Sequence, residues 1–236
     1  MHQRLRRQGF ELARYPAVTD CLRRRARLLR HHQVDLVIDV GANCGQYGAM
    51  LRRLGYGGRM VSFEPLHDAF QRLQRAAAAD PLWETRPLAC GAVVGPATLH
   101  VAGNSESSSL LAMLPAHVAA EPRSAYVGEQ SVTVTTLDAV FPGLHRGERQ
   151  VWLKIDTQGS EAQVLHGAAQ TLNQVQWLQI ELSLRPLYAG ALEFDRMQAL
   201  VRGLGFDWFG LEPGFSDPAT GELLQVDGIF KRRAAP

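Results

Sequence analysis

The stretch VDLVIDVGANCGQ, residues 34–46, decides the fold class. Its first seven residues form a short, mostly apolar and β-branched run, which is typical of a strand buried in a parallel sheet. Gly41 ends this run and a helix is expected to begin near Gln46, so the chain turns tightly from strand to helix. Gly41 and Gly45 would let the main chain approach a ligand, and free N–H groups there would face a bound anion. The stretch predicts a ligand-binding turn in an α/β fold.

Outward from this stretch, strand and helix patterns alternate along the chain. The predicted strands cover residues 34–40, 59–63, 85–89, 151–155, 177–182, 206–210 and 228–231. The predicted helices cover residues 46–54, 68–79, 160–172 and 194–204. This alternation is typical of a Rossmann-like α/β fold, with a mostly parallel seven-stranded sheet and helices on both faces. Segments 97–101 and 131–135 are expected to pair as antiparallel additions. No linker is visible, which predicts one domain at 34–236 after an N-terminal helical extension at 1–33.

The composition indicates a soluble, cytoplasmic globular protein. Of the 236 residues, 46% are hydrophobic and 20% are charged, which suits a chain that buries a full core. No apolar run approaches the roughly 18 residues of a membrane span, and the N-terminus lacks the apolar stretch of a secretory signal. Cys21, Cys44 and Cys90 are far apart and lack ligand spacing, so we expect reduced thiols rather than a zinc site or a disulfide.

The first 30 residues are rich in arginine. Nine Arg stand against two acidic residues there, a local charge of +7 in a chain of net charge +2. Such an arm could contact nucleic acid or an anionic membrane surface. However, Leu22, Ala26 and Leu29 recur at helical spacing between the arginines, which favours a helix docked on the core.

Asn43 indicates which nucleotide cofactor the turn suits. A dinucleotide site requires GxGxxG, and Asn43 stands where the middle glycine would meet the pyrophosphate. The pattern instead suits a smaller anion, such as the methionine carboxylate of S-adenosylmethionine, with Asp39 accepting from the ammonium group of the same molecule. An NAD(P)-dependent oxidoreductase and a non-catalytic nucleotide-binding module are the alternatives.

Glu64 supplies a second signal for the same cofactor. It ends the next predicted strand, 25 residues after Asp39. An acidic side chain at that place can accept hydrogen bonds from both hydroxyls of a ribose. Pro65, directly after it, would lie against the adenine face.

At this point the sequence resembles the FkbM-type methyltransferase family. The likeness runs from about residue 34 to 230 and rests on DVGANCGQYG (39–48), VSFEP (61–65), NSESSSL (104–110), LKIDTQGSE (153–161) and IELSLRPLY (180–188). It implies a class I methyltransferase that uses S-adenosylmethionine, and many members resemble O-methyltransferases acting on sugars, glycolipids or polyketide hydroxyls. Gln158 departs from the family, which often has Glu there. The expected cofactor-binding residues are Asp39, Gly41, Asn43, Gly45, Gln46, Tyr47, Glu64, Pro65, Ala89, Ser108 and Ser109.

The catalytic residues are expected at the end of the strand at 151–155. Strand alternation sends Lys154 and Asp156 to the same face, beside the cofactor crevice. Lysine is rare in this chain, so Lys154 indicates a need for a compact ammonium group. We expect Asp156 to act as a base toward an acceptor hydroxyl, with Lys154 and Glu181 orienting the acceptor. The alternatives are a structural ion pair at Lys154 and a divalent cation such as Mg²⁺ held by Asp156 and Glu181; no metal ligand is assigned.

The expected acceptor is a small molecule or a glycoside. Polar groups at Asn104 and Ser107 to Ser109 would contact the cofactor or the acceptor, and Tyr188 and Phe215 would form acceptor walls. A nucleic-acid substrate is not expected, because no Asn/Asp-Pro-Pro-Tyr-like amine site and no Pro-Cys nucleophile follow the strand at 151–155. The acceptor's identity stays open, as does assembly into a homo-oligomer.

Overall fold

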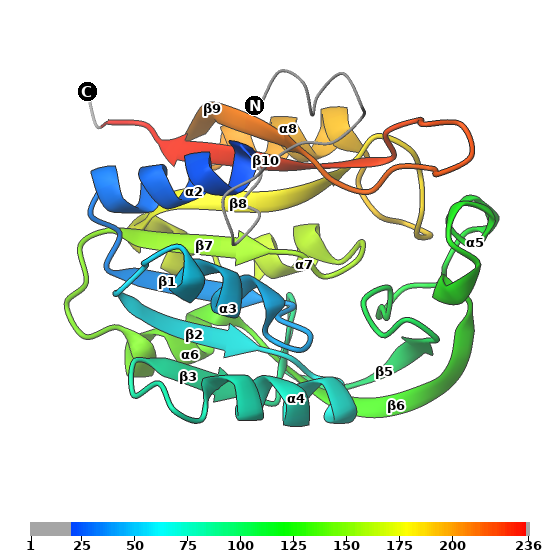
Figure 1. The fold of residues 1–236 in the computed structure, drawn as a ribbon, viewed down its shortest axis with the longest axis horizontal. Coiled ribbons are helices and arrows are strands. Elements are labelled where there is room, and N and C mark those ends of the chain that lie inside the picture. Colours follow the sequence, from blue (N-terminus) through cyan, green and yellow to red (C-terminus); the bar gives the residue numbers. More distant parts are fainter. Residues whose placement is uncertain (1–19, 235–236) are drawn as a thin grey trace, which may run out of the picture.

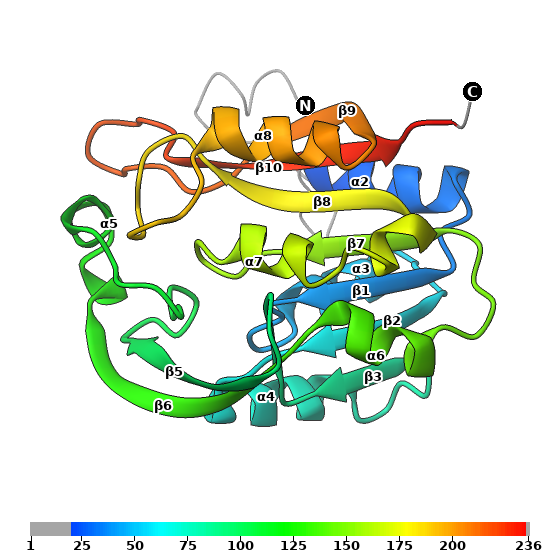
Figure 2. The same ribbon diagram turned by 180° about the vertical axis from the view of Figure 1, so that it is seen from behind.

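The structure is a computed structural model that describes residues 20–234. Residues 1–19, which hold part of the arginine-rich arm, lie outside the described residues. The main sheet has seven strands in the order β3-β2-β1-β7-β8-β10-β9, as Figures 1 and 2 show from its two sides. The strands are β1 (Leu36–Val40), β2 (Arg59–Phe63), β3 (Trp83–Arg86), β7 (Val151–Ile155), β8 (Val175–Ser183), β9 (Phe206–Pro213) and β10 (Gln225–Arg232). The predicted seven-stranded, mostly parallel sheet is confirmed, and β10 runs antiparallel to both of its neighbours.

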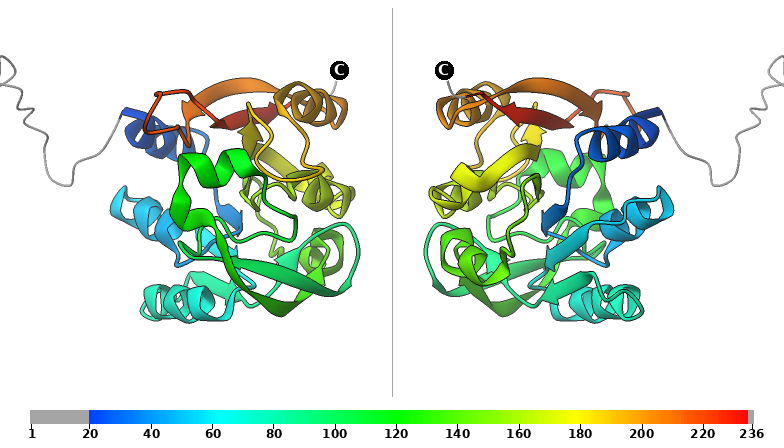
Figure 3. Two further views of the ribbon diagram at one scale, coloured as in Figure 1. Left: turned by 90° about the vertical axis from the view of Figure 1, so that its right-hand side faces the viewer. Right: turned by 90° about the vertical axis from the view of Figure 1, so that its left-hand side faces the viewer.

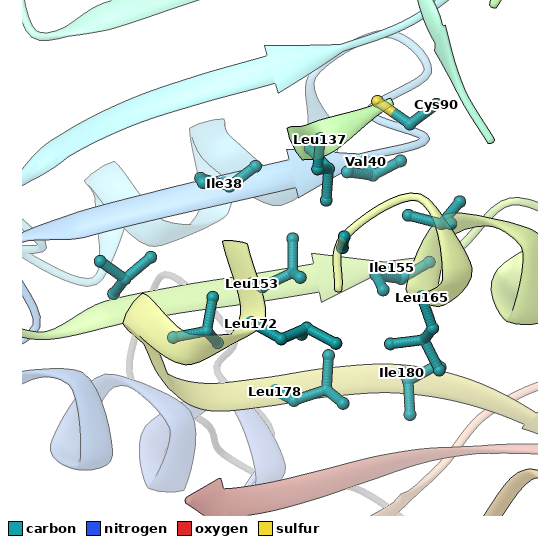
Figure 4. Packing of buried hydrophobic residues seen from close by; sticks show 14 of the residues in the cluster. Ile38, Val40, Cys90, Leu137, Leu153, Ile155, Leu165, Leu172, Leu178 and Ile180 are labelled. Atoms are coloured by element: carbon teal, nitrogen blue, oxygen red, sulfur yellow. The ribbon is translucent and has the colours of Figure 1, made fainter. Parts of the chain in front are cut away.

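Helices cover both faces of this sheet. One face packs against α2 (Asp20–His31), α3 (Gln46–Arg53) and α4 (His67–Ala77), with Val37, Trp152 and Trp177 in the shared core. The opposite face packs against α6 (Leu137–Leu144), α7 (Glu161–His166) and α8 (Phe194–Gly203). Figure 4 shows this second core, in which Ile38 and Leu153 of adjacent strands point toward the helices. All five residues of β1 are buried because successive side chains enter opposite cores.

The central strands match their predicted bounds closely because they are buried on both faces. Segment Arg59–Phe63 and segment Val151–Ile155 form strands at the predicted positions. Their registers align the strand ends: Asp39 pairs with Ser62 on one side and with Lys154 on the other. As a result, the loops after β1, β2 and β7 meet at the same edge of the sheet.

The antiparallel segments form a separate sheet, which the sequence did not predict. Strands β5 (Gly95–Ala102) and β6 (Tyr126–Thr135) pair with each other as expected, and β4 (Ala89–Cys90) joins them on the other side of β6. The connection between β5 and β6 holds the short helix α5 (Pro115–Ala120) and a 3₁₀ turn at Pro122–Ser124. Figure 3 shows β5, β6 and the connection between them at the carboxyl edge of the main sheet, facing the viewer in the left panel.

Two helix predictions were wrong. The helix expected over 160–172 ends at His166, and a 3₁₀ turn follows at Thr171–Gln174. Gly167 is the C-cap of this helix, and glycine is required there because a Cβ would lie 2.0 Å from the carbonyl oxygen of Gly91. Helix α6 was not predicted, since Pro142 lies inside it and proline removes a helical hydrogen bond. The side chain of Thr136 caps its start by accepting from the Ala139 N–H.

The N-terminal helix α2 is docked on the sheet within residues 20–31, as predicted. Leu29 is buried in the core that α3 and α4 share. Arg25, on the same helix, is also buried and forms an ion pair with Glu212 of β9. Across residues 20–234, no helix combines the length and apolarity required to cross a membrane.

Candidate active site

A cavity of about 490 Å³ opens where the loops after β1, β2 and β7 meet. The Gly41 turn, Glu64 and Asp156 line it, each directly after the end of one of these strands. This is the edge at which open α/β sheets bind their ligands. The residues predicted for the cofactor that line it are Gly41, Asn43, Gln46, Tyr47, Glu64, Pro65, Ala89 and Ser108. Asp39, Gly45 and Ser109, also predicted, are not among the lining residues.

Two glycines shape the turn, and the packing of the protein itself requires both. Gly41 has φ +80°, and a Cβ there would lie 1.8 Å from the backbone oxygen of Asp156. Gly45 has φ +83°, and its Cβ would meet Leu73 at 2.9 Å. Both positions require glycine because of their left-handed backbone and their close packing against the protein itself.

The main-chain N–H groups of residues 41–45 donate within the protein. Those of Gly41 and Ala42 bond to the Phe63 carbonyl, at 3.1 and 3.0 Å. The Asn43 N–H bonds to Glu64, and the Asn43 side chain accepts from the Cys44 N–H at 2.8 Å. The expectation that free N–H groups of this loop face a bound anion is therefore wrong for residues 41–45.

Glu64 is a buried carboxylate at the cavity wall, with 6% of its surface exposed. Its two oxygens accept from the N–H groups of Asn43, at 2.8 Å, and Leu66, at 2.7 Å. Burial raises the pKa of Glu64 to about 7, although both hydrogen bonds oppose the shift. Beside it the wall is apolar, formed by Pro65, Leu88, Ala89, Leu99 and Leu110. A carboxylate next to an apolar wall fits a ribose joined to a flat base.

Lys154 forms the centre of a charged cluster on the same sheet face. Its ammonium group lies 3.1 Å from Asp39 Oδ1 and 3.3 Å from Asp156 Oδ2, and it donates to the Gly41 carbonyl at 3.2 Å. Burial lowers the pKa of Lys154, but Asp156 and Asp39 outweigh it, so the net shift is upward. The structural ion pair considered as an alternative is therefore present. Asp39 is 1% exposed behind Lys154, so the geometry gives no support to its predicted contact with the cofactor ammonium.

Strand register extends this cluster into a row of carboxylates. Glu181 pairs with Asp227, which in turn pairs with Glu212, and Asp156 follows the end of β7 beside them. Arg25 reaches this row from α2, contacting Glu212 and lying 3.5 Å from Asp227. Arg25 and Asp227 both line the cavity. Neither residue was predicted from the sequence, because the pairing of β8, β10 and β9 brings Asp227 to the site and the docking of α2 brings Arg25.

Gln158 lies between two of the predicted catalytic carboxylates. Its Nε2 donates to Asp156 Oδ1 at 2.8 Å and to Glu181 Oε2 at 3.0 Å. Its Oε1 lies 2.8 Å from the Tyr188 hydroxyl, which donates to it. Glu181 also accepts from the Gln225 amide, at 2.7 Å, and does not line the cavity.

The remaining predicted residues contact other groups of the protein and do not line the cavity. Ser109 donates to the Gln158 carbonyl at 2.7 Å. Tyr188 is 1% exposed, and Phe215 packs against the ring of His117 at 5.3 Å. Neither Tyr188 nor Phe215 lines the cavity, so the expected acceptor walls are not formed by these side chains. Asn104 likewise bonds to Ser107 within its own loop, at 2.9 Å. Among the described residues, no group of three or more His, Cys, Asp or Glu is arranged to hold a metal ion.

Comparison with solved structures identifies the class of the fold. The O-methyltransferase TomG from Streptomyces achromogenes, in complex with S-adenosylmethionine, matches with TM-score 0.52 and 13% identity, over 99% of this chain and 87% of that one. The methyltransferase domain of METTL16 matches with TM-score 0.51 and 10% identity, over 94% of this chain and 71% of that one. The fold is that of the class I methyltransferases. Comparison with curated proteins gave no match.

The family is identified by sequence. The model of the methyltransferase FkbM domain matches residues 39–207, and the chain belongs to this family. It is therefore a methyltransferase that depends on S-adenosylmethionine. The family match overturns one alternative considered from the sequence, an NAD(P)-dependent oxidoreductase.

Proposed function

We propose that the chain methylates a hydroxyl group of a sugar, a glycolipid or a polyketide-type small molecule, with Asp156 accepting the hydroxyl proton. The observation that carries this proposal is the position of Asp156. It lines the cavity directly after Ile155 ends β7, and its side chain is 32% exposed. A hydroxyl is a poor nucleophile unless its proton leaves as the new bond forms, and a carboxylate within reach can take that proton.

The residues at the β1 and β2 ends would hold the cofactor. Glu64 would accept from the ribose hydroxyls, Pro65 and Ala89 would flank the base, and Asn43 and Gln46 would contact the methionine portion. S-adenosylmethionine, when bound, supplies a methyl group on a positively charged sulfur. The chain's own contribution is then to align the acceptor oxygen with that methyl group and to exclude other nucleophiles.

Lys154 and Gln158 would keep Asp156 in a productive orientation. The ammonium group lies 3.3 Å from Asp156 Oδ2, and the amide nitrogen lies 2.8 Å from Oδ1. Both oxygens thus have one fixed donor and keep further lone-pair capacity for the acceptor hydroxyl. We place Asp156 as the base, and Lys154 and Glu181 as residues that act through it.

The charges at the cavity wall favour an acceptor without a phosphate or carboxylate group near the reacting hydroxyl. The ionisable lining residues are the carboxylates Glu64, Glu106, Asp156 and Asp227 and the cations Arg25 and Lys154. The two cations are both paired with carboxylates, so the charged groups of the wall are net negative. A polyhydroxylated neutral molecule would supply the matching donors, whereas an anion would meet like charge.

The experiment is an acceptor screen with S-adenosylmethionine that carries a labelled methyl group. Neutral glycosides, macrolide-like alcohols and phosphorylated counterparts of the same glycosides would be compared. We expect label in an O-methyl ether of a neutral acceptor and little in the phosphorylated counterparts. Label found only on nitrogen, carbon or a nucleic acid would contradict the proposal.

A further inference from the structure

The amide group of Gln158 has the bonding pattern of a bridging cation. Its nitrogen carries two hydrogens, and one is available for each of the carboxylates at 2.8 and 3.0 Å, Asp156 and Glu181. The two carboxylates lie on adjacent strands, β7 and β8, and they repel each other when both are ionised; burial and the neighbouring Asp156 raise the pKa of Glu181. Divalent cations bridge carboxylate oxygens in just this situation.

The position of the amide is fixed from three sides. The Tyr188 hydroxyl donates to Gln158 Oε1 at 2.8 Å, which orients the nitrogen toward the carboxylates. The Ser109 hydroxyl donates to the Gln158 main-chain carbonyl at 2.7 Å. Glu161, which is buried, accepts from the N–H groups of Thr157 and Gly159, at 2.9 and 3.0 Å, and so holds the turn on either side of Gln158.

The backbone at Gln158 has a conformation that non-glycine residues seldom adopt. Its φ is +57°, a left-handed value that costs a non-glycine residue free energy. Gly159 follows with φ +100°, and a Cβ there would lie 2.8 Å from Cβ of Tyr188. The turn therefore packs tightly against Tyr188, the residue whose hydroxyl orients the Gln158 amide.

We propose that the Gln158 amide takes the place of a divalent cation between Asp156 and Glu181, so that this methyltransferase positions its base without a metal. For its consequence in catalysis, the inference rests on the proposed role of Asp156. Gln158 is a positioning residue here, since it acts on the acceptor through Asp156. Replacing the amide by a carboxylate would convert the bridge into a third ligand and create a cation site of three carboxylates.

The test is a titration of the full chain with Mn²⁺, followed by the electron paramagnetic resonance signal of the free ion. Gln158→Glu is expected to bind one Mn²⁺ about tenfold or more tightly than the wild type, because affinity rises with the number of carboxylate ligands. Gln225→Glu is the matched control: it makes the same change beside Glu181 but at the residue that has no contact with Asp156 in the structure. Gln225→Glu should gain much less Mn²⁺ affinity than Gln158→Glu. The double variant with Asp156→Asn and Gln158→Glu should return to the Mn²⁺ affinity of the wild type.

Two results would overturn the inference. One is a folded Gln158→Glu protein, checked by its thermal unfolding, that gains no Mn²⁺ affinity over the wild type. The other is a wild-type protein that already binds Mn²⁺ and loses this binding in Asp156→Asn. This second result would overturn the inference even if Gln158→Glu does not fold. Since Mn²⁺ binding is measured without an acceptor, failure to find O-methylation would leave this result unaffected.

Discussion

Lys154 of β7 and Asp39 of β1 stand opposite each other in paired strands, with the ammonium nitrogen 3.1 Å from the carboxylate oxygen. Both side chains are almost fully buried, at 7% and 1% exposure. The same ammonium group reaches Asp156 and the Gly41 carbonyl, so it joins the cofactor turn to the proposed base. The pairing of β1 with β7 brings the two halves of the site together, and this ion pair links their side chains.

Removing Lys154 should destabilise the protein strongly. Lys154→Met leaves the Asp39 carboxylate buried without a partner, and breaking a buried pair in this way costs about 3–5 kcal/mol of unfolding free energy. Lys154→Arg should rescue little, since the planar guanidinium does not reproduce a compact ammonium group. Urea denaturation measures the effect, with Lys231→Met at the exposed second lysine as the control. Adding Asp39→Asn to Lys154→Met should recover part of the loss; if it recovers none, the pair is not the cause.

Arg25 should contribute much more to the free energy of unfolding than Arg23, an exposed residue of the same helix. Arg25→Ala leaves Glu212, which is 1% exposed, without its cation, whereas Arg23 is exposed on the same helix. We expect a loss of about 3–5 kcal/mol for Arg25→Ala and within about 0.5 kcal/mol for Arg23→Ala. Thermal and urea unfolding would compare the two. Equal effects would mean that α2 is not held on the sheet through Arg25.

Glu64 should contribute directly to cofactor binding. Glu64→Ala is expected to weaken S-adenosylmethionine by about 1.5–3 kcal/mol, the range for hydrogen bonds to a charged group. Titration calorimetry measures it, with Asp68→Ala at an exposed position of α4 as the control. An affinity equal to that of the control would remove Glu64 from the site.

Cofactor affinity should depend on pH through the same residue. The pKa of Glu64 is raised by burial from its ordinary 4.5 to about 7, so the side chain takes up a proton in the free protein as the pH falls through 7. If the ribose binds the ionised form, affinity should be flat above pH 7 and fall by up to about tenfold per unit below it. The stability of the free protein should change in the opposite sense, because a raised carboxyl pKa favours the folded state as the pH falls from 7 toward 4.5. Glu64→Gln should abolish the pH dependence of affinity and reduce that of stability, to which other buried carboxyl groups such as Glu161 and Glu181 also contribute. A pH dependence of affinity that persists in Glu64→Gln would assign it to another group.

Much of the fold could be predicted because the central strands are buried on both faces and are mostly apolar. Residues 59–63 and 151–155 have no exposed face, and both strands were placed correctly. Segments 97–101 and 131–135 were predicted only as antiparallel additions, since alternation alone does not say which sheet a segment joins; they form the short sheet with β4. Helix α6 was missed because Pro142 and Gly143 interrupt its pattern.

Site residues that directly follow a predicted strand could be found from the sequence. Site residues that the pairing or docking of distant segments brings together could not. Asp156 and Glu64 were found because each stands directly after a recognisable strand. Asp227 and Arg25 were missed, since their approach depends on the pairing of β8, β10 and β9 and on the docking of α2. Gln158 was read as a lost carboxylate, whereas its bonds to Asp156 and Glu181 become visible only with the turn around it.

The most direct test of the central claim is the rate of methyl transfer by Asp156→Asn to the acceptor that the screen identifies. The substitution keeps the shape of the side chain and removes its ability to take a proton. We expect S-adenosylmethionine to bind with nearly unchanged affinity while turnover falls by about 10²–10⁴-fold, the usual contribution of a general base. An Asp156→Asn enzyme with wild-type turnover would contradict the account, and alignment of the two substrates would then be the remaining source of catalysis.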